Sequence, residues 1–371
     1  MTSLTAMPRA GQLECICEPA ALGEKAGDRR GMALLATGFA FSVLAQVLTL
    51  SILPLTGLSL APVQGLASLP YAAFYIGAAL ASLPASLLLD SFGRRAAFSL
   101  GASLGAAGGL VLVWALVSMH FGALVLGAFW LGIAGGFSLF YRHAVVPVGG
   151  RGAMALLIVF GAATLAGLVA PSIASLVEAA AVPRAFAGTA TAAALAHVAS
   201  LAATVALPLQ RRLKQENETA ALQGWRSLLL PTAIGALGWF VMTALMGATP
   251  VAVIGCAPSE AVVGAVAWHV MAMYAPALAL AVVPKAARPV PLSAVGCLFL
   301  ATGAIAFAVS GSVGGFSVSA ALVGTGWSLL MLGTTLWVDS KGPVSRWLLG
   351  IHDGALLTGA VLGAFAASAL A

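Results

Sequence analysis

Residues 64–118 read QGLASLPYAAFYIGAALASLPASLLLDSFGRRAAFSLGASLGAAGGLVLVWALVS. The charged residues of this stretch, Asp90, Arg94 and Arg95, all fall at its middle. The apolar runs on either side of these charges are each long enough, as a helix, to cross a hydrocarbon core of ~30 Å. The stretch therefore predicts two transmembrane helices joined by a short charged turn.

The rest of the chain repeats this alternation of apolar runs and charged clusters. Hydrophobic residues make up 61% of the 371 residues and charged residues only 8%, with a mean hydropathy of +1.05. A typical soluble domain is about 25% charged, so the composition argues against a soluble enzyme, a disordered chain or a nucleic-acid-binding protein. A membrane β-barrel would show short alternating strands, which this sequence lacks. We predict an all-α integral membrane protein with about eleven transmembrane helices, at approximately 32–53, 64–89, 96–118, 121–141, 153–176, 186–208, 227–247, 260–283, 290–310, 314–337 and 347–370.

The positions of Lys and Arg predict the orientation of these helices, because cytoplasmic loops of membrane proteins are enriched in both residues. With a cytoplasmic N-terminus, the only basic residue outside is Arg184. The sixteen inside are Arg9, Lys25, Arg29, Arg30, Arg94, Arg95, Arg142, Arg151, Arg211, Arg212, Lys214, Arg226, Lys285, Arg288, Lys341 and Arg346. The net charge of +6 is thus a topology signal and indicates no nucleic-acid partner. We expect the protein in the lipid bilayer of a bacterial cytoplasmic (inner) membrane.

A weak internal repeat with an offset near 195 residues suggests two halves in the same orientation. The first predicted helix follows Arg30 and the seventh follows Arg226, while Arg151 matches Arg346. The repeat would divide the chain into a cytoplasmic tail, a half of six helices, a cytoplasmic linker and a half of five helices. These segments are 1–31, 32–208, 209–226 and 227–371. The partner of the sixth helix would fall beyond Ala371, so we expect a missing twelfth helix and an outside C-terminus.

The turn at Leu87–Ala96 resembles the loop signature G-x-L-x-D-x-x-G-R-R/K of the major facilitator superfamily, although its leading Gly is absent. The matching residues are Asp90, Gly93, Arg94 and Arg95. Weaker similarity to a bacterial branch of that superfamily extends over about 32–370, with Tyr141-Arg142 and Gly350-Ile351-His352-Asp353 among its pieces. The resemblance implies a bundle of two parallel-repeat halves that acts as a secondary transporter by alternating access. It also implies that the matching residues form a gate with the start of the last helix.

Two ionisable side chains within the predicted helices are candidate coupling residues, because charges are costly inside a membrane. Asp353 lies seven residues after Arg346, about 10 Å into its helix, and could couple transport to protons. The alternative is an interfacial capping residue that water reaches. His269 lies near mid-membrane and could titrate near neutral pH or bind a ligand. The alternative there is a packed histidine without a functional role.

Polar and aromatic residues within the predicted helices suggest a substrate cavity. Because Arg and Lys appear only near helix ends, the cavity should be mostly apolar and should accept a small, weakly charged or apolar molecule. Each residue alone could equally serve helix packing. The candidate cavity residues are Gln46, Tyr71, Tyr75, Thr243, Trp327 and Ser328.

Motifs for catalysis, metal binding and cofactor binding are not apparent. The pair Cys15 and Cys17 offers two thiols, fewer ligands than a zinc site requires, and no nucleotide-hydrolysis motif is present. We therefore predict a non-enzymatic secondary transporter with no cofactor or metal. The alternative is a transport-inactive relative that acts as an assembly factor, sensor or scaffold, for which the missing twelfth helix is the main support.

The charge asymmetry predicts that a reporter fused after Ala371 will lie outside the cytoplasm. A periplasm-dependent reporter such as alkaline phosphatase should be active at this position and inactive when fused before Met1. Cytoplasmic activity after Ala371 would contradict the predicted number of crossings.

Overall fold

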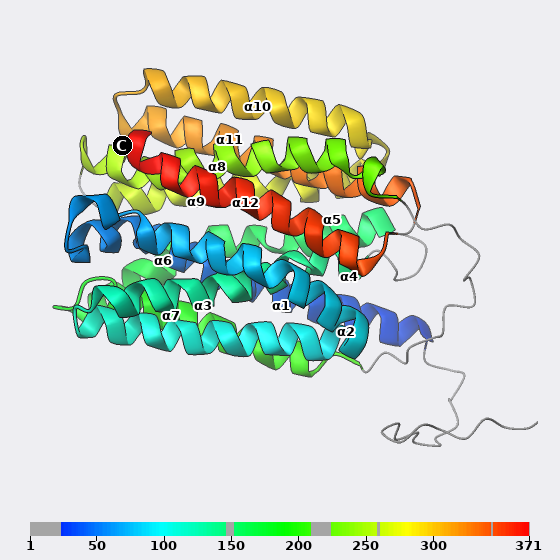
Figure 1. Cartoon of the computed structure of the whole chain (residues 1–371), viewed down its shortest axis with the longest axis horizontal. Helices are drawn as coiled ribbons and strands as arrows, with labels where there is room; N and C mark the ends of the chain where they lie inside the picture. Colours follow the sequence, from blue (N-terminus) through cyan, green and yellow to red (C-terminus); the bar gives the residue numbers. More distant parts are fainter. Residues whose placement is uncertain (1–23, 146–151, 209–223, 258–259, 343, 371) are drawn as a thin grey trace, which may run out of the picture.

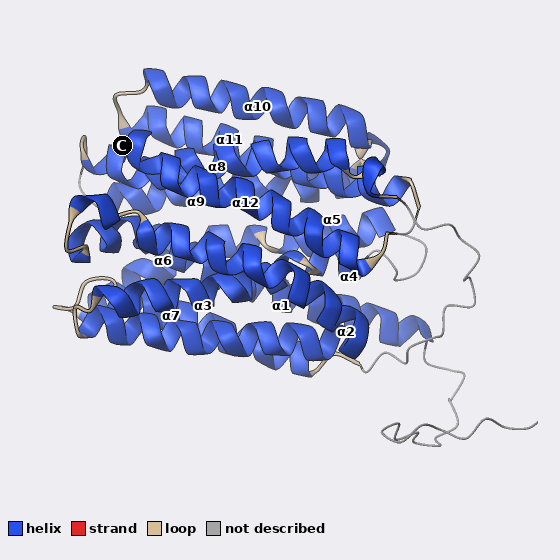
Figure 2. Cartoon of the chain, viewed as in Figure 1, coloured by secondary structure: helices blue, strands red, loops and turns tan. Residues whose placement is uncertain are grey.

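The structure is a computed structural model that describes residues 24–145, 152–208, 224–257, 260–342 and 344–370. Within these ranges all regular structure is helical (Figure 2), and ten helices are long and apolar enough to cross a membrane. Most of the predicted tail 1–31 and of the linker 209–226, together with Ala371, lies outside the described residues.

The N-terminal helices comprise α1 to α7. Their bounds are α1 Glu24–Leu60, α2 Leu69–Val117, α3 Phe121–Leu139, α4 Tyr141–Val145, α5 Gly152–Ala162, α6 Thr164–Ala181 and α7 Ala187–Val205. The C-terminal helices comprise α8 to α12, with bounds α8 Leu229–Ile254, α9 Glu260–Val282, α10 Pro289–Val309, α11 Val313–Ser340 and α12 Arg346–Leu370. Short 3-10 turns precede α2 (η1, Gln64–Leu66), α8 (η2, Trp225–Ser227) and α10 (η3, Pro284–Ala286).

Helix α2 contains two membrane crossings rather than one. Its 49 residues would form a straight helix about 74 Å long, more than twice the ~30 Å of a hydrocarbon core. The backbone leaves the helical region at Gly93 (φ 80°, ψ 176°), and the chain turns back along its first arm (Figure 1). Dividing α2 at Gly93 raises the ten membrane-capable helices to eleven crossings, which confirms the predicted helical architecture.

Apart from Arg184, at the turn between α6 and α7, the described basic residues gather at one end of the bundle. Helix α1 begins at this end and α12 finishes at the opposite one (Figure 1), as an odd number of crossings requires. We call the end at which α1 begins the basic end. The exposed or half-exposed residues at its turns and helix ends are Arg29, Arg30, Arg94, Arg95, Arg226, Lys285, Arg288, Lys341 and Arg346.

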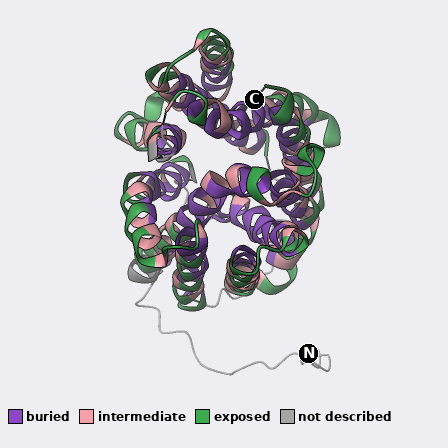
Figure 3. Cartoon of the chain, turned by 90° about the vertical axis from the view of Figure 1, so that its left-hand side faces the viewer, coloured by how far each residue is buried: buried purple, intermediate pink, exposed green. Residues whose placement is uncertain are grey.

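Small residues let the helices pack closely, while the outer surface is apolar. A Cβ on Gly101 would lie 2.6 Å from the Cβ of Phe137, and one on Gly105 would lie 2.4 Å from the Nδ1 of His197. Viewed from the end, buried residues face the middle of the bundle and exposed ones its periphery (Figure 3). Many of the exposed side chains are large and apolar, such as Leu110 and Leu298, as expected of a surface that faces lipid.

The turn within α2 should depend on Gly93, because L-residues with a side chain rarely adopt a positive φ. We expect Gly93→Ala to lower the free energy of unfolding by about 1–2 kcal/mol, although no atom would lie within 4 Å of the new Cβ. Gly314→Ala is the matched control, since that site is also open but lies in helical backbone of α11. Thermal unfolding of the purified protein should show a loss only for Gly93→Ala, and equal stability of the two variants would contradict the strained-turn account.

Candidate functional site

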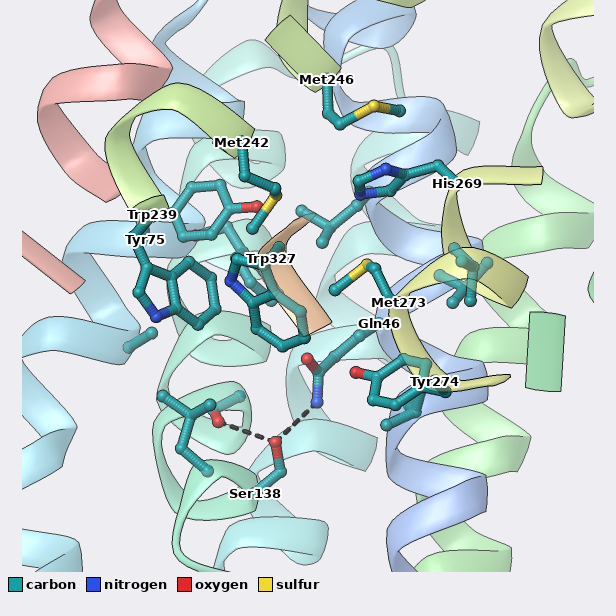
Figure 4. Close-up of a pocket in the computed structure, with 18 of the residues that line it drawn as sticks. Gln46, Tyr75, Ser138, Trp239, Met242, Met246, His269, Met273, Tyr274 and Trp327 are labelled. Atoms are coloured by element: carbon teal, nitrogen blue, oxygen red, sulfur yellow. Dashed lines mark hydrogen bonds between the residues drawn. The ribbon is translucent and has the colours of Figure 1, made fainter. Parts of the chain in front are cut away.

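A central cavity of about 90 Å³ lies between the N-terminal and C-terminal helices. The walls come from α1, α2, α3 and α5 on one side and from α8, α9, α11 and α12 on the other. Figure 4 shows side chains from both sets of helices converging on this space. A cavity between two sets of helices can be exposed to either end of the bundle when those sets move apart.

Aromatic rings form much of the cavity wall. Trp327 lies 5.1 Å from Trp239 at 87° and 6.1 Å from Phe160 at 20°, measured between ring centroids. Tyr274 lies 5.2 Å from Phe160, and Tyr75 lies 6.3 Å from Trp239. These tilted, edge-on and offset arrangements are the geometries that aromatic pairs prefer. The cavity therefore offers flat apolar faces at several angles.

Several side chains on the cavity wall have their polar groups fixed by protein hydrogen bonds. The Nε2 of Gln46 donates to the Oγ of Ser138 at 2.7 Å, and Ser138 donates to the carbonyl oxygen of Gly135 at 2.8 Å (Figure 4). On the opposite wall, the Nδ1 of His269 lies 2.9 Å from the carbonyl oxygen of Ala320. None of the described residues that line the cavity is Asp, Glu, Lys or Arg.

Five residues that the sequence suggested lie on this wall, and two do not. Gln46, Tyr71, Tyr75, Trp327 and His269 line the cavity. The hydroxyl of Thr243 instead donates to the carbonyl oxygen of Ala360 at 3.0 Å, where α8 packs against α12. Ser328 is fully buried away from the cavity. The sequence placed these two residues in helices that line the cavity. It did not show which face of each helix meets the cavity.

A buried ion pair joins the N-terminal and C-terminal helices toward the basic end. Arg142 of α4 donates from Nη2 to Oδ1 of Asp353 in α12, and the two side chains are 2% and 0% exposed. His143 Nε2 lies 3.4 Å from Oδ2 of Asp353. His352 Nε2 lies 3.9 Å from Oδ1, while its Nδ1 lies 2.6 Å from the hydroxyl of Thr232. We call Arg142, His143, His352 and Asp353 the polar cluster.

The polar cluster corrects two expectations from the sequence. Arg142 was assigned to an inside loop, but α4 continues directly from α3 and carries its side chain into the protein. One expectation for Asp353 was an interfacial residue that water reaches, yet it is fully buried, with a cationic partner and two histidine neighbours. The available sequence signal was the run Tyr141-Arg142-His143, in which charge follows an apolar helix without an intervening polar loop.

The predicted gate residues lie beside this cluster, where α2 meets α12. The hydroxyl of Ser86 donates to the carbonyl oxygen of Arg346, at the start of α12. Arg94 Nη1 donates to the carbonyl oxygen of Ala144 at 3.2 Å. Asp90 is exposed but lies within electrostatic range of the Arg346 guanidinium. Gly93 forms the turn itself, and Arg95 is half-buried on the following turn.

A second contact between the two sets of helices lies toward the opposite end. The hydroxyl of Tyr71 donates to the carbonyl oxygen of Thr243 at 3.2 Å. A Cβ on Gly247 would lie 2.7 Å from Cε1 of Tyr71, so the ring fits closely against α8. Tyr71 also lines a separate hollow of about 200 Å³ at that end, together with Gln64 and Ser368. Its side chain therefore separates the central cavity from this hollow.

Comparison with known proteins identifies the fold. No family model matches the chain. A riboflavin transporter from Brucella anthropi, RfnT, is 28% identical over 330 residues, which cover 86% of this chain and 83% of the relative. The human organic anion transporter MFSD10 (TETRAN) superposes with a TM-score of 0.66 at 16% identity, covering 92% of both chains. The E. coli fucose:proton symporter FucP (N162A) gives 0.52 at 15% identity, covering 90% and 97%.

The chain has the fold of the major facilitator transporters. This confirms, at the level of the fold, the resemblance that the Asp90–Arg95 loop suggested, and the relatives above are all transporters rather than enzymes. Within the described residues, no group of three or more His, Cys, Asp or Glu side chains could hold a metal ion. Cys15 and Cys17 lie outside the described residues. The functional chemistry of this chain is therefore best sought in the cavity and in the contacts at its two ends.

We expect the polar cluster to make a large contribution to stability, because removing one partner leaves a buried charge unpaired. Asp353→Asn and Arg142→Gln should each lower the free energy of unfolding by about 3–5 kcal/mol. The double variant Arg142→Met with Asp353→Leu should lower the free energy of unfolding by less than the sum of the two single effects. Arg184→Gln is the control, since Arg184 is exposed and surface charges contribute about 0–1 kcal/mol. Thermal unfolding in detergent measures the stability of all four variants. If the two single variants lose as little stability as the control, the result would contradict a buried ion pair.

Proposed function

We propose that the protein is a secondary transporter that carries a weakly charged, planar aromatic small molecule through the central cavity by alternating access. The observation that carries this proposal is the aromatic wall around Trp327, contributed by both sets of helices. A planar ring system can stack on such faces from either side. The same wall has no fixed charge among its described residues, which disfavours a strongly charged substrate.

The size of the cavity supports a transport cycle with a conformational change. Sites for drug-sized ligands have volumes of about 300–1,000 Å³, whereas this cavity has about 90 Å³. A molecule of that size can enter only when the two sets of helices separate. We propose that the contacts around Arg142–Asp353 and Ser86–Arg346 close the basic end, and that Tyr71–Thr243 closes the other end. Alternating access would break these contacts in turn.

The charge asymmetry supports a cytoplasmic location for the basic end. In that orientation Asp353, with its Arg142 partner, is the candidate for coupling transport to protons. A proton on Asp353 would remove the negative charge with which Arg142 pairs, and the contact between α4 and α12 would weaken. Asp90 and Arg346 would add a second, more exposed part to the same gate, with Gly93, Arg94 and Arg95 shaping the turn that carries Asp90.

The relatives indicate which compound to test first. The similarity to a riboflavin transporter extends over most of both chains, and riboflavin combines a planar, uncharged ring system with a polar chain. This matches the chemistry of the aromatic wall. We therefore propose a flavin or a similar fused heterocycle as the substrate.

Reconstituted protein should take up riboflavin, and Trp327→Leu should reduce uptake about tenfold or more, because stacking on an aromatic side chain contributes about 1–3 kcal/mol per ring. Uptake of radiolabelled riboflavin into proteoliposomes, with and without a pH gradient, is the measurement. Trp114→Leu is the matched control, since Trp114 is 57% exposed on the outer surface and does not line the cavity.

Three results would contradict the proposal. Folded wild-type protein that neither binds nor exchanges any flavin would rule out this substrate class. Unchanged uptake by the Trp327→Leu protein would show that transport does not depend on the aromatic wall. Binding without exchange across the membrane would instead favour a transport-inactive sensor or scaffold.

A further inference from the structure

Among the described residues, only one of the two ring nitrogens of His269 has a hydrogen-bond partner. The ring belongs to α9, is 4% exposed and lines the central cavity. Its Nδ1 lies within hydrogen-bond distance of the carbonyl oxygen of Ala320 in α11. Figure 4 shows the ring pointing from α9 toward the cavity, beside Met246 and Met273.

The Ala320 contact determines which ring nitrogen carries the proton. A carbonyl oxygen can only accept a hydrogen bond, so Nδ1 must be the donor. In a neutral imidazole the other nitrogen, Nε2, then carries a lone pair and accepts. Helix α11 thus holds His269 in one tautomer, with an acceptor directed at the cavity.

The same reasoning fixes a second acceptor on the opposite wall. The single hydroxyl proton of Ser138 is donated to the carbonyl oxygen of Gly135, so Ser138 must accept from Gln46. That requirement places the amide nitrogen of Gln46 toward Ser138 and leaves its Oε1 as the free acceptor. The hydrogen bonds of Gln46 to Ser42 and Ser138 both use Nε2.

We infer that His269 is a specificity-determining residue whose Nε2 accepts a hydrogen bond from a ring N–H group of the transported molecule. The inference rests on the proposed function and narrows its substrate class to planar heterocycles that carry a ring N–H donor. A ligand without such a donor would leave the buried Nε2 unpaired. Sites that hydrogen-bond a polar group of their ligand strongly reject analogues that lack this group.

The test compares two ligands that differ in one donor. Riboflavin carries a single ring N–H, at N3 between two carbonyl groups, and N3-methylriboflavin lacks it. Quenching of flavin fluorescence by the purified protein gives both dissociation constants. We expect the wild type to bind riboflavin at least about tenfold more tightly than the methylated compound. In His269→Phe the ratio of the two dissociation constants should fall close to one, mainly because riboflavin binds more weakly.

Two further variants keep the result interpretable. His269→Gln should retain the preference, because its amide can donate to Ala320 and still present an oxygen to the cavity. His120→Phe is the control: His120 caps α3 at an exposed turn and does not line the cavity, so its ratio should equal that of the wild type. If His269→Phe fails to fold, His269→Leu replaces it as the variant without an acceptor, and its ratio should likewise fall close to one.

The outcomes separate this inference from the proposed function. Equal binding of the two flavins by the wild type would overturn the inference while leaving flavin transport intact. A preference that persists in His269→Phe would also overturn it, because the methyl group would then be rejected by shape alone. Absence of any flavin binding would refute the proposed function and, with it, this inference.

Discussion

The buried ion pair between Arg142 and Asp353 connects the N-terminal and C-terminal helices where their separation would open the cavity. Two opposite charges withdrawn from solvent are stable only while they remain together, because isolating either one is costly in a low-dielectric surrounding. The pair therefore resists separation of α4 from α12. His143 and His352 lie 3.4 and 3.9 Å from the same carboxylate, so side chains from both sets of helices meet at this one contact.

The cavity is built by a different kind of interaction from the gate. Its walls are aromatic and its few polar groups are already oriented by the protein through Ser138 and Ala320. Because these polar groups are oriented before a ligand binds, the site need not become ordered during binding in order to select its ligand. Charge is thus concentrated at the basic end, where the helices would separate in the proposed cycle, and is absent from the described cavity wall, where a weakly charged molecule would pass.

Much of this architecture could be predicted from the sequence, because membrane thickness fixes helix length and loop charge predicts topology. The loop at Asp90–Arg95 predicted both the sharp turn and the fold. The partner of Asp353 could not be predicted, since Arg142 lies 211 residues away and resembles a loop charge by position. Thr243 and Ser328 show the same limit, because the face of a helix that meets a cavity depends on packing between helices that are distant in the chain.

Access to the cavity from the basic end tests the gating role of the ion pair most directly. Ala78 lines the cavity and is buried, so Ala78→Cys, in a background with the four native cysteines replaced, reports on access. In membrane vesicles that expose the basic end, a membrane-impermeant maleimide should label this cysteine slowly. Adding Asp353→Asn should increase the labelling rate at least about tenfold, the change that corresponds to about 1.4 kcal/mol. An unchanged or slower rate in a folded Asp353→Asn protein would contradict the claim that the Arg142–Asp353 pair holds this end closed.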